Sequence, residues 1–336
     1  LAEYAGDVLP LSYGPAKRKA ELRYGENPHQ KAAVYVDPLA PEGSLGASTL
    51  LCGKAISFNN YGDVDAAWAL ARELPPPACA VIKHANPCGA AVGDTLLEAY
   101  EKAVACDPRS AFGGIVALNE RLTVEVAEAM AVKDRFFEVL IAPGIDEDAL
   151  AVFLSDDAPK WGKSLRVLDA GTAESTPFGL DVRSIDGGLL VQTRDDKPFG
   201  EGAPTLATKT QPSARQVKDL DFAWRVCKHV RSNAIVLAKD GMAVGVGAGQ
   251  MSRVEATEIA VTRALRFAED SDVELEGMVV ASDAFYPFND AIEVALDAGA
   301  RAIVQPGGSH NDENAVKLCD DRDVPMWFAG NRHFRH

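Results

Sequence analysis

The sequence predicts an α/β protein in which a largely parallel or mixed sheet carries helices on its faces. Three observations support this class. Short apolar runs alternate with amphipathic stretches, and the same alternation occurs in both halves of the chain. Hydrophobic residues make up 47% of the 336 residues and charged residues 25%, which suits a globular protein with a substantial core.

In the first half, each short apolar run is bounded by polar residues, as expected of a buried strand. We expect strands at residues 78–82, 114–118, 137–141 and 165–168. The amphipathic stretches between them predict helices at residues 95–106, 123–132 and 146–154. Because strand and helix alternate, parallel strands with helical connections are favoured.

The second half repeats this order after a hairpin. Residues 234–238 and 242–246 are apolar runs separated by Lys239, Asp240 and Gly241, and Asp-Gly between such runs is a strong turn signal. Further strands are expected at residues 278–281, 302–304 and 326–328, with helices at 254–268, from 290 and at 314–318.

The connection between the halves, about residues 171–211, is rich in Gly, Pro, Asp and Thr and predicts a small hairpin around Asp186. We therefore expect two similar α/β lobes. The predicted segments are a junction and substrate-binding arm at 1–30, a first lobe at 31–205 and a second lobe at 206–336. Because the chain begins with Leu rather than Met, residues 1–20 are expected to follow a preceding part of a longer protein.

Charge and cysteine usage narrow the class of function. A formal charge of −15 repels nucleic acid and acidic membrane surfaces, so neither is an expected partner and an anionic ligand must be met by locally gathered Arg or Lys. Six scattered cysteines without a C-x-x-C pattern fit reduced thiols. No secretory leader and no run of about 18 apolar residues is present, so we expect a cytoplasmic protein.

Polar residues gather where predicted strands end, which is where ligands bind in open α/β sheets. Lys83 and His84 follow one strand, and residues 282–288 and 305–309 follow two others. An imidazole titrates near neutrality and can move a proton, whereas an ammonium group can stabilise a developing oxyanion or bind a phosphate. The Lys83-His84 pair is therefore a candidate catalytic site. The alternative is that Lys83 is solvated and His84 caps the strand in a polar loop.

A zinc site is the alternative, because His84, Asn86, Pro87 and Cys88 faintly match the signature of nucleobase deaminases. Asn86 stands where that signature needs glutamate, and one cysteine stands where two are needed. We therefore expect no metal, with Cys88 as a structural turn residue after Pro87. Asn86 is expected either to shape the loop or to support a residue that contacts the substrate.

Other stretches point to anion binding. Arg23 carries a planar, always charged group suited to phosphate, and the glycines after Phe112 leave backbone N–H groups accessible. Residues 245–253 link a strand to a helix, but their glycine spacing does not fit a dinucleotide fingerprint. Residues 331–336 hold two Arg and two His.

Together these stretches resemble the AICAR transformylase portion of the bifunctional purine biosynthesis proteins, over about residues 22–336. The motifs that carry the resemblance occur in the family's order: RYGENPHQ, VIKHANPCGAA, SAFGGIVALN, KHVRSNAIV, GVGAGQMSR, SDAFYPFND, IVQPGGS and RHFRH. The resemblance implies formyl transfer from the co-substrate 10-formyltetrahydrofolate to AICAR, 5-aminoimidazole-4-carboxamide ribonucleotide. It also implies two tandem cytidine-deaminase-like αβα lobes with mixed sheets and no zinc, and a homodimer with sites at its interface. The family's N-terminal IMP cyclohydrolase domain is absent here, so that activity is not expected.

The resemblance also implies roles for individual residues. His84 matches the proton-transfer residue, Lys83 the neighbouring catalytic cation and Asn233 the residue that holds the substrate carboxamide. The positions that match AICAR contacts are Arg23, Tyr24, Phe112, Gly113, Phe285 and Arg332. Those that match contacts with the folate or the reacting centre are Glu138, Val254, Phe285, Pro287, Asp290 and Ser309.

Some animal members of the family hold a potassium ion near the stretch that matches residues 227–234. Here Cys227, Val230 and Ala234 replace oxygen-bearing side chains of that stretch, so the presence of the ion is doubtful in this chain. The competing functions are a zinc-dependent deaminase or amidohydrolase on the same fold and a non-catalytic metabolite-binding module.

Overall fold

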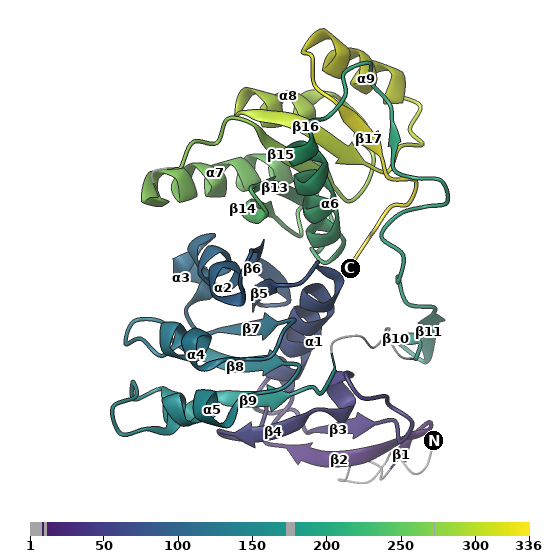
Figure 1. The fold of residues 1–336 in the computed structure, drawn as a ribbon. Coiled ribbons are helices and arrows are strands. Elements are labelled where there is room, and N and C mark those ends of the chain that lie inside the picture. The colour runs from purple at the N-terminus through teal and green to yellow at the C-terminus, as the bar shows by residue number, and fades with distance from the viewer. Residues whose placement is uncertain (1–8, 10–11, 173–178, 272) are drawn as a thin grey trace. The chain divides into compact units, whose positions relative to one another are not determined.

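The computed structural model describes residue 9 and residues 12–172, 179–271 and 273–336. The chain separates into two compact units, each built from two segments (Figure 1). Unit 1 comprises Leu1–Arg72 and Phe112–Arg194, and unit 2 comprises Glu73–Ala111 and Asp195–His336. The units interleave along the sequence, and the continuous lobes expected at 31–205 and 206–336 stay a prediction.

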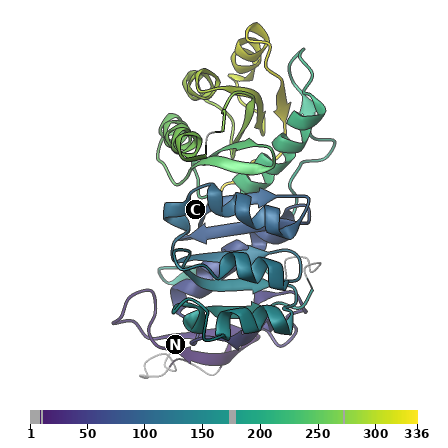
Figure 2. The same ribbon diagram turned by 60° about the vertical axis from the view of Figure 1, so that its left-hand side comes forward.

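The main sheet of unit 1 contains parallel strands with one antiparallel strand at their edge. Its strands are β7 (Gly114–Leu118), β8 (Phe137–Ala142), β9 (Arg166–Asp169) and β4 (Thr49–Cys52), in the order β7-β8-β9-β4. The helices α4 (Val124–Met130) and α5 (Glu147–Leu154) lie side by side along one face (Figure 2). Helix α1 (Phe58–Glu73) buries Trp68 and Leu70 in the core of this unit.

The described residues of unit 1 also form two small antiparallel sheets and the 3-10 turns η2 (Leu45–Ala47) and η3 (Gly162–Ser164). The first sheet is β1 (Ser12–Tyr13), β2 (Ala16–Leu22) and β3 (Ala32–Val36), and the second is the hairpin of β10 (Asp181–Ile185) and β11 (Gly188–Gln192). The hairpin expected around Asp186 is thus confirmed. Residues 1–8 and 10–11 of the expected junction, and 173–178 of the expected connection, lie outside the described residues.

Unit 2 contains a mixed sheet in the order β12-β17-β16-β15-β13-β14-β6-β5. Its strands are β5 (Ala78–Lys83), β6 (Asn86–Val92), β12 (Thr205–Leu206), β13 (Ile235–Lys239), β14 (Met242–Gly247), β15 (Met278–Ser282), β16 (Ala300–Gln305) and β17 (Met326–Phe328). The predicted hairpin of β13 and β14 is confirmed, with Asp240 at a φ of 52° and Gly241 at a φ of 70° in its turn.

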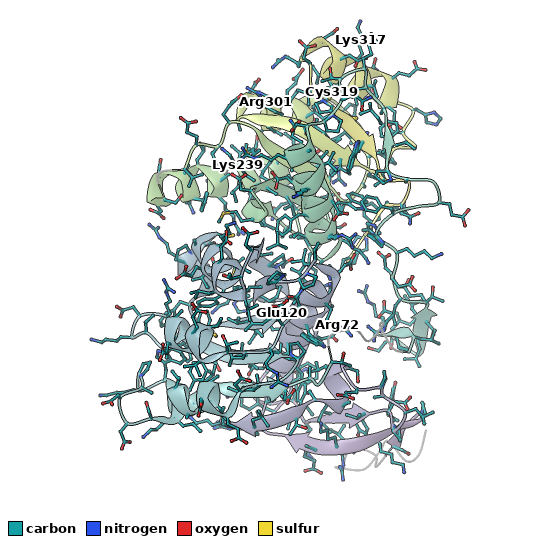
Figure 3. All side chains as sticks on the ribbon, viewed as in Figure 1. Arg72, Glu120, Lys239, Arg301, Lys317 and Cys319 are labelled. Atoms are coloured by element: carbon teal, nitrogen blue, oxygen red, sulfur yellow. The ribbon has the colours of Figure 1, made fainter. Side chains whose placement is uncertain are left out.

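The helices of unit 2 are α2 (Leu96–Ala105), α3 (Pro108–Ala111), α6 (Ala214–Lys228), α7 (Arg253–Ser271), α8 (Asp290–Asp297) and α9 (Asp312–Asp321). Helix α6 was not among the predicted helices, although a capping box of Ser213 and Gln216 marks its start. In α9, Cys319 is buried and Lys317 is exposed, so the two faces of the helix differ in polarity (Figure 3). Among the described residues, no helix is both long and apolar enough to cross a membrane.

Strand β6 corrects one prediction from the sequence. Cys88 lies inside this strand, not in a turn, and is 8% exposed. The reason is close packing against α2: a Cβ atom at Gly89 would lie 1.9 Å from the carbonyl oxygen of Ala103. The small residues at positions 89–91 therefore serve a buried strand rather than a loop.

Strand directions bring several connections of unit 2 to one edge of its sheet. Strands β5, β14, β15, β16 and β17 run in one direction and β6 and β13 in the other. The residues that follow the first group and those that precede the second therefore meet at the same edge, here called the carboxyl edge. Ligands of open α/β sheets bind at such an edge.

We predict that Gly245→Ala destabilises the protein by about 2–3 kcal/mol, because overpacking a close contact costs this much. A Cβ at Gly245 would lie 2.2 Å from the carbonyl oxygen of Ala260, so α7 would have to move off β14. Urea unfolding followed by circular dichroism measures the change.

The matched control is Gly62→Ala in α1, where a Cβ meets nothing within 4 Å. This change should raise stability by up to about 1 kcal/mol, because alanine is the better helix former. Equal effects of the two substitutions would contradict the close contact between β14 and α7.

Candidate functional site

The site begins at a tight turn that carries the predicted catalytic pair. Lys83, the last residue of β5, pairs with Asn86, so His84 and Ala85 form a two-residue loop. Their φ angles are 53° and 60°, and positive φ at both positions is the geometry of a type I′ turn. A non-glycine residue in this region costs of order 1 kcal/mol or more, and such strain clusters at functional sites. The turn holds His84 exposed at the carboxyl edge.

Asn86 fastens this turn to the segment before β13. Its Nδ2 donates to the carbonyl oxygen of His84 at 3.2 Å, and its Oδ1 accepts from the backbone N–H of Arg231 at 3.0 Å. The expected loop-shaping role of Asn86 is therefore confirmed. Because Arg231 lies two residues before Asn233, the same contact brings the Lys83-His84 turn close to the predicted carboxamide binder.

The amide side chain of Asn233 has a fixed orientation. Its Nδ2 donates to the carbonyl oxygen of Gln250 at 2.9 Å, and its Oδ1 accepts from Nη2 of Arg253 at 2.8 Å. An amide has two N–H donors and two acceptor lone pairs, so one of each is left for a ligand. Asn233 can therefore bind a group that offers both a donor and an acceptor, such as a carboxamide.

A buried ion pair holds Arg253 in place. Nη1 of Arg253 lies 2.5 Å from Oδ1 of Asp283 and 2.8 Å from Oγ of Ser282. Asp283 is fully buried, and the hydroxyl of Ser232 donates to its second oxygen. The sequence places Arg253 and Asp283 within the quoted motifs, but pattern alone gave them no role, because Arg253 lies 30 residues from Asp283 and 20 from Asn233 along the chain.

A second buried cluster lies at the end of α6. Glu73 accepts from Nζ of Lys228 at 2.8 Å and from Nε2 of His229 at 2.8 Å. Burial alone would raise the pKa of Glu73, but the hydrogen bond with His229 and the charges of His229 and Lys228 lower it to about 2. Burial lowers the pKa of His229, and the nearby charges of Arg335 and Lys228 lower it further, against the opposing effect of Glu73.

The expected folate contacts of unit 2 also lie on its carboxyl edge. Val254 is the second residue of α7, beside Arg253. Phe285 and Pro287 lie in the connection after β15, where both are exposed. Asp290 begins α8, and the backbone N–H of Ser309, after β16, donates to Asp312 at 3.0 Å.

The C-terminal residues fold back onto unit 2 at the same edge. The N–H of His333 donates to the carbonyl oxygen of Asp283 at 3.0 Å, and the N–H of Ser232 donates to that of Arg335 at 2.9 Å. Arg332, directly before the first of these contacts, is exposed, with its guanidinium 4.6 Å from the ring of Phe334. The tail is therefore an ordered part of the site region, and it presents a cation.

Unit 1 carries the other expected AICAR contacts. Arg23 is exposed, with its guanidinium 5.6 Å from the ring of Tyr24. The next residues form a compact turn in which the N–H of Gly25 donates to the carbonyl oxygen of Gln30 at 2.8 Å. Phe112 is 56% exposed, so its ring is accessible to a ligand.

Two expected residues of unit 1 lie at the amino ends of parallel strands, whereas ligands of open α/β sheets bind at the carboxyl ends. Gly113 precedes β7 and donates its N–H to the carbonyl oxygen of Phe136 at 2.6 Å, at a φ of 70°. Glu138 is the second residue of β8 and forms an ion pair with Arg166 at 2.6 Å. Its carboxylate is thus already engaged by a cation of the next strand.

Metal binding needs donors that these residues do not assemble. The thiol of Cys88 donates to the carbonyl oxygen of Val81 at 3.4 Å, and burial raises its pKa to about 12. Zinc binds the thiolate, so Cys88 is a poor partner for His84. Within the described part of the chain, no group of three or more His, Cys, Asp or Glu is placed to hold a metal ion.

The sequence model of the family described as AICARFT/IMPCHase bienzyme matches residues 6–263, more than half of the chain. The chain belongs to this family of purine biosynthesis enzymes. The matched range includes Lys83, His84 and Asn233, whereas the expected contacts from Phe285 onward lie beyond it. The match does not separate the transformylase from the cyclohydrolase activity of the AICARFT/IMPCHase family.

We predict that stability falls in two steps as the pH is lowered. A His229 whose folded pKa lies below its usual value near 6.5 favours the folded state above pH 6.5, and this contribution is lost as the pH falls below that value. A Glu73 whose pKa drops from 4.5 to about 2 contributes above pH 4.5, and its contribution is lost as the pH approaches 2.

The Glu73→Gln variant should lose roughly 3 kcal/mol of stability at pH 7, because it leaves Lys228 buried without its counter-charge. Its stability should no longer change between pH 4.5 and 2 through this group. Urea unfolding across the pH range tests both effects, with Glu101→Gln at an exposed position of α2 as the control. Identical pH profiles for the wild type and Glu73→Gln would contradict the role of the cluster.

Proposed function

We propose that the chain is an AICAR transformylase, a phosphoribosylaminoimidazolecarboxamide formyltransferase. It would transfer the formyl group of 10-formyltetrahydrofolate to the 5-amino group of AICAR, giving FAICAR and tetrahydrofolate on the route to IMP. The observation that carries the proposal is the Lys83-His84 turn with its exposed imidazole, which Asn86 and Arg231 connect to the oriented amide of Asn233. Membership of the AICARFT/IMPCHase family supports it.

Asn233 would activate the AICAR amine, which is a weak nucleophile. The lone pair of the AICAR amine is delocalised toward the neighbouring carboxamide, so the free amine attacks poorly. The unused donor and acceptor of the Asn233 amide can bind that carboxamide and hold it in an orientation that returns the lone pair to the amine. The bonds from Arg253 and to Gln250 keep the amide from rotating as it does so.

His84 and Lys83 act on the transfer itself. The amine nitrogen forms a bond to the formyl carbon, and the bond from that carbon to N10 of the folate then breaks. The imidazole of His84 takes the proton that the amine loses, and N10 of the departing tetrahydrofolate gains a proton. The tetrahedral intermediate carries an oxyanion, and the ammonium of Lys83 would stabilise it by roughly 3 kcal/mol.

The remaining features belong to the same proposal. The folded state would contain two cytidine-deaminase-like lobes without zinc, and the active enzyme would be a cytoplasmic homodimer with its sites at the interface. Arg23, Tyr24, Phe112, Gly113, Phe285 and Arg332 would bind AICAR, while Glu138, Val254, Pro287, Asp290 and Ser309, together with Phe285, would contact the folate or the reacting centre.

The deciding experiment incubates the purified chain with AICAR and 10-formyltetrahydrofolate. The absorbance of tetrahydrofolate and chromatography of the purine products are followed together. FAICAR should accumulate without IMP, and the rate should survive dialysis against a chelator. No reaction would contradict the proposal, IMP formation would show an unexpected cyclohydrolase activity, and a chelator-sensitive deamination of AICAR would favour the zinc alternative.

We predict that His84→Ala lowers kcat by about 100-fold or more, the usual contribution of a general base, while AICAR affinity changes by less than about threefold. His84 is exposed at the tip of its turn, so the variant should fold. Turnover and calorimetric titration with AICAR measure the two effects. Added imidazole should restore part of the rate, and wild-type turnover in the variant would rule out proton transfer by His84.

Arg332→Ala should weaken AICAR binding by roughly tenfold or more, because a charge-assisted hydrogen bond to phosphate contributes about 1.5–3 kcal/mol. Folate affinity should stay unchanged. The control is Arg322→Ala, which removes an exposed arginine that pairs with Asp297 on the surface of the same unit. Equal AICAR affinity of Arg332→Ala and the wild type by calorimetry would exclude the phosphate contact.

A further inference from the structure

His333 fastens the C-terminal residues to unit 2. It is 2% exposed, with Nδ1 2.6 Å from Oδ2 of Asp195 and Nε2 2.9 Å from the carbonyl oxygen of Pro198. Both partners are acceptors, so the ring bonds to both when each of its nitrogens carries a proton. The ring also lies 5.0 Å, centroid to centroid, from that of Trp224, whose own N–H donates to Pro198.

The backbone at His333 and Arg335 forms hydrogen bonds with two residues that are linked to Asn233. The N–H of His333 donates to the carbonyl oxygen of Asp283, whose carboxylate holds Arg253. The N–H of Ser232, directly before Asn233, donates to the carbonyl oxygen of Arg335. A displacement of the tail would therefore reach the Asn233 amide by two routes.

Chain ends are poorly ordered unless they are tied down. In residues 332–336 exposure alternates around the anchor, since Arg332 and Phe334 are exposed while His333 is buried. The buried imidazole thus fixes the tail, and the exposed neighbours stay accessible to a ligand.

We propose that His333 is a positioning residue for formyl transfer: it holds the C-terminal segment, and through Ser232, Asp283 and Arg253 it keeps the Asn233 amide aligned with the substrate carboxamide. This inference rests on the proposed function, because it assigns His333 an effect on that reaction. The contact with Asp195 is the part of the anchor that can be changed from the surface, since the side chain of Asp195 is 53% exposed.

The experiment therefore compares substitutions of Asp195 with His333→Ala. Asp195→Ala removes the acceptor for Nδ1 and should lower kcat about fivefold or more, because small displacements of catalytic groups cost up to about 100-fold. The KM for 10-formyltetrahydrofolate should stay within about twofold, because the expected effect is on the alignment of the reacting groups and not on folate binding. Asp195→Asn keeps an acceptor oxygen and should retain most of the wild-type kcat.

His333→Ala should lower kcat further than Asp195→Ala, and the double variant should be no worse than His333→Ala, because both changes break the same contact. The matched control is Asp196→Ala, the adjacent exposed aspartate. All rates are taken per mole of folded enzyme, so that a loss of stability alone does not count as a loss of kcat.

Amide hydrogen exchange supplies a readout that does not depend on activity. The backbone N–H groups at positions 232 and 333 should exchange faster in Asp195→Ala and His333→Ala than in the wild type or Asp196→Ala, because their acceptors move away. Unchanged exchange in Asp195→Ala would overturn the anchor. Faster exchange with an unchanged kcat per folded enzyme would overturn the positioning role.

The two proposals fail in distinguishable ways. A wild-type chain without transformylase activity contradicts the proposed function, and with it the effect of His333 on that reaction. Exchange at Ser232 then still decides the anchor: faster exchange in Asp195→Ala supports it, and equal exchange refutes it.

Discussion

The carboxyl edge of unit 2 depends on the ion pair between Arg253 and Asp283. Both residues are buried, at 9% and 0% exposure, so each would carry a large desolvation penalty without the other. Arg253 also donates to Ser282 and Asn233, and Asp283 accepts from Ser232. Loss of one partner leaves a buried charge that costs about 3–5 kcal/mol, so the connections that meet at this pair are held in one arrangement.

Much of the fold could be predicted because its signals are local. The turn at Asp240-Gly241 between apolar runs gave the hairpin of β13 and β14, and Met326–Phe328 is a strand with the bounds expected. Strand β6 could not be predicted in this way. Its turn has positive φ at His84 and Ala85, where the familiar signal is Asn-Gly, so the turn reads as a strand end and Cys88 was wrongly placed in a loop.

The site was only partly predictable, because only some of its signals are local in the sequence. Residue types at a strand end indicated Lys83 and His84, and the family resemblance indicated Asn233. The structure brings these residues onto one edge of unit 2. The choice of partners is not local. Glu73 lies 155 residues from Lys228, and Glu138 pairs with Arg166 on the next strand. No pattern of nearby residues encodes such pairs, because they arise only when strands from distant parts of the chain align.

Different cations at the carboxyl edge are suited to two tasks, orienting Asn233 and attracting an anion. The buried Arg253 is neutralised by Asp283, so the pair orients Asn233 without attracting an anion. Arg332 is exposed and lies outside that pair, so its charge can attract an anion to a chain whose formal charge is −15. An exposed cation contributes little to folding stability. Arg332 can therefore bind a ligand at little cost in folding stability, provided that its backbone is held in place. The buried contacts of His333 hold that backbone. Stability and affinity at this edge thus depend on different residues of the same segment.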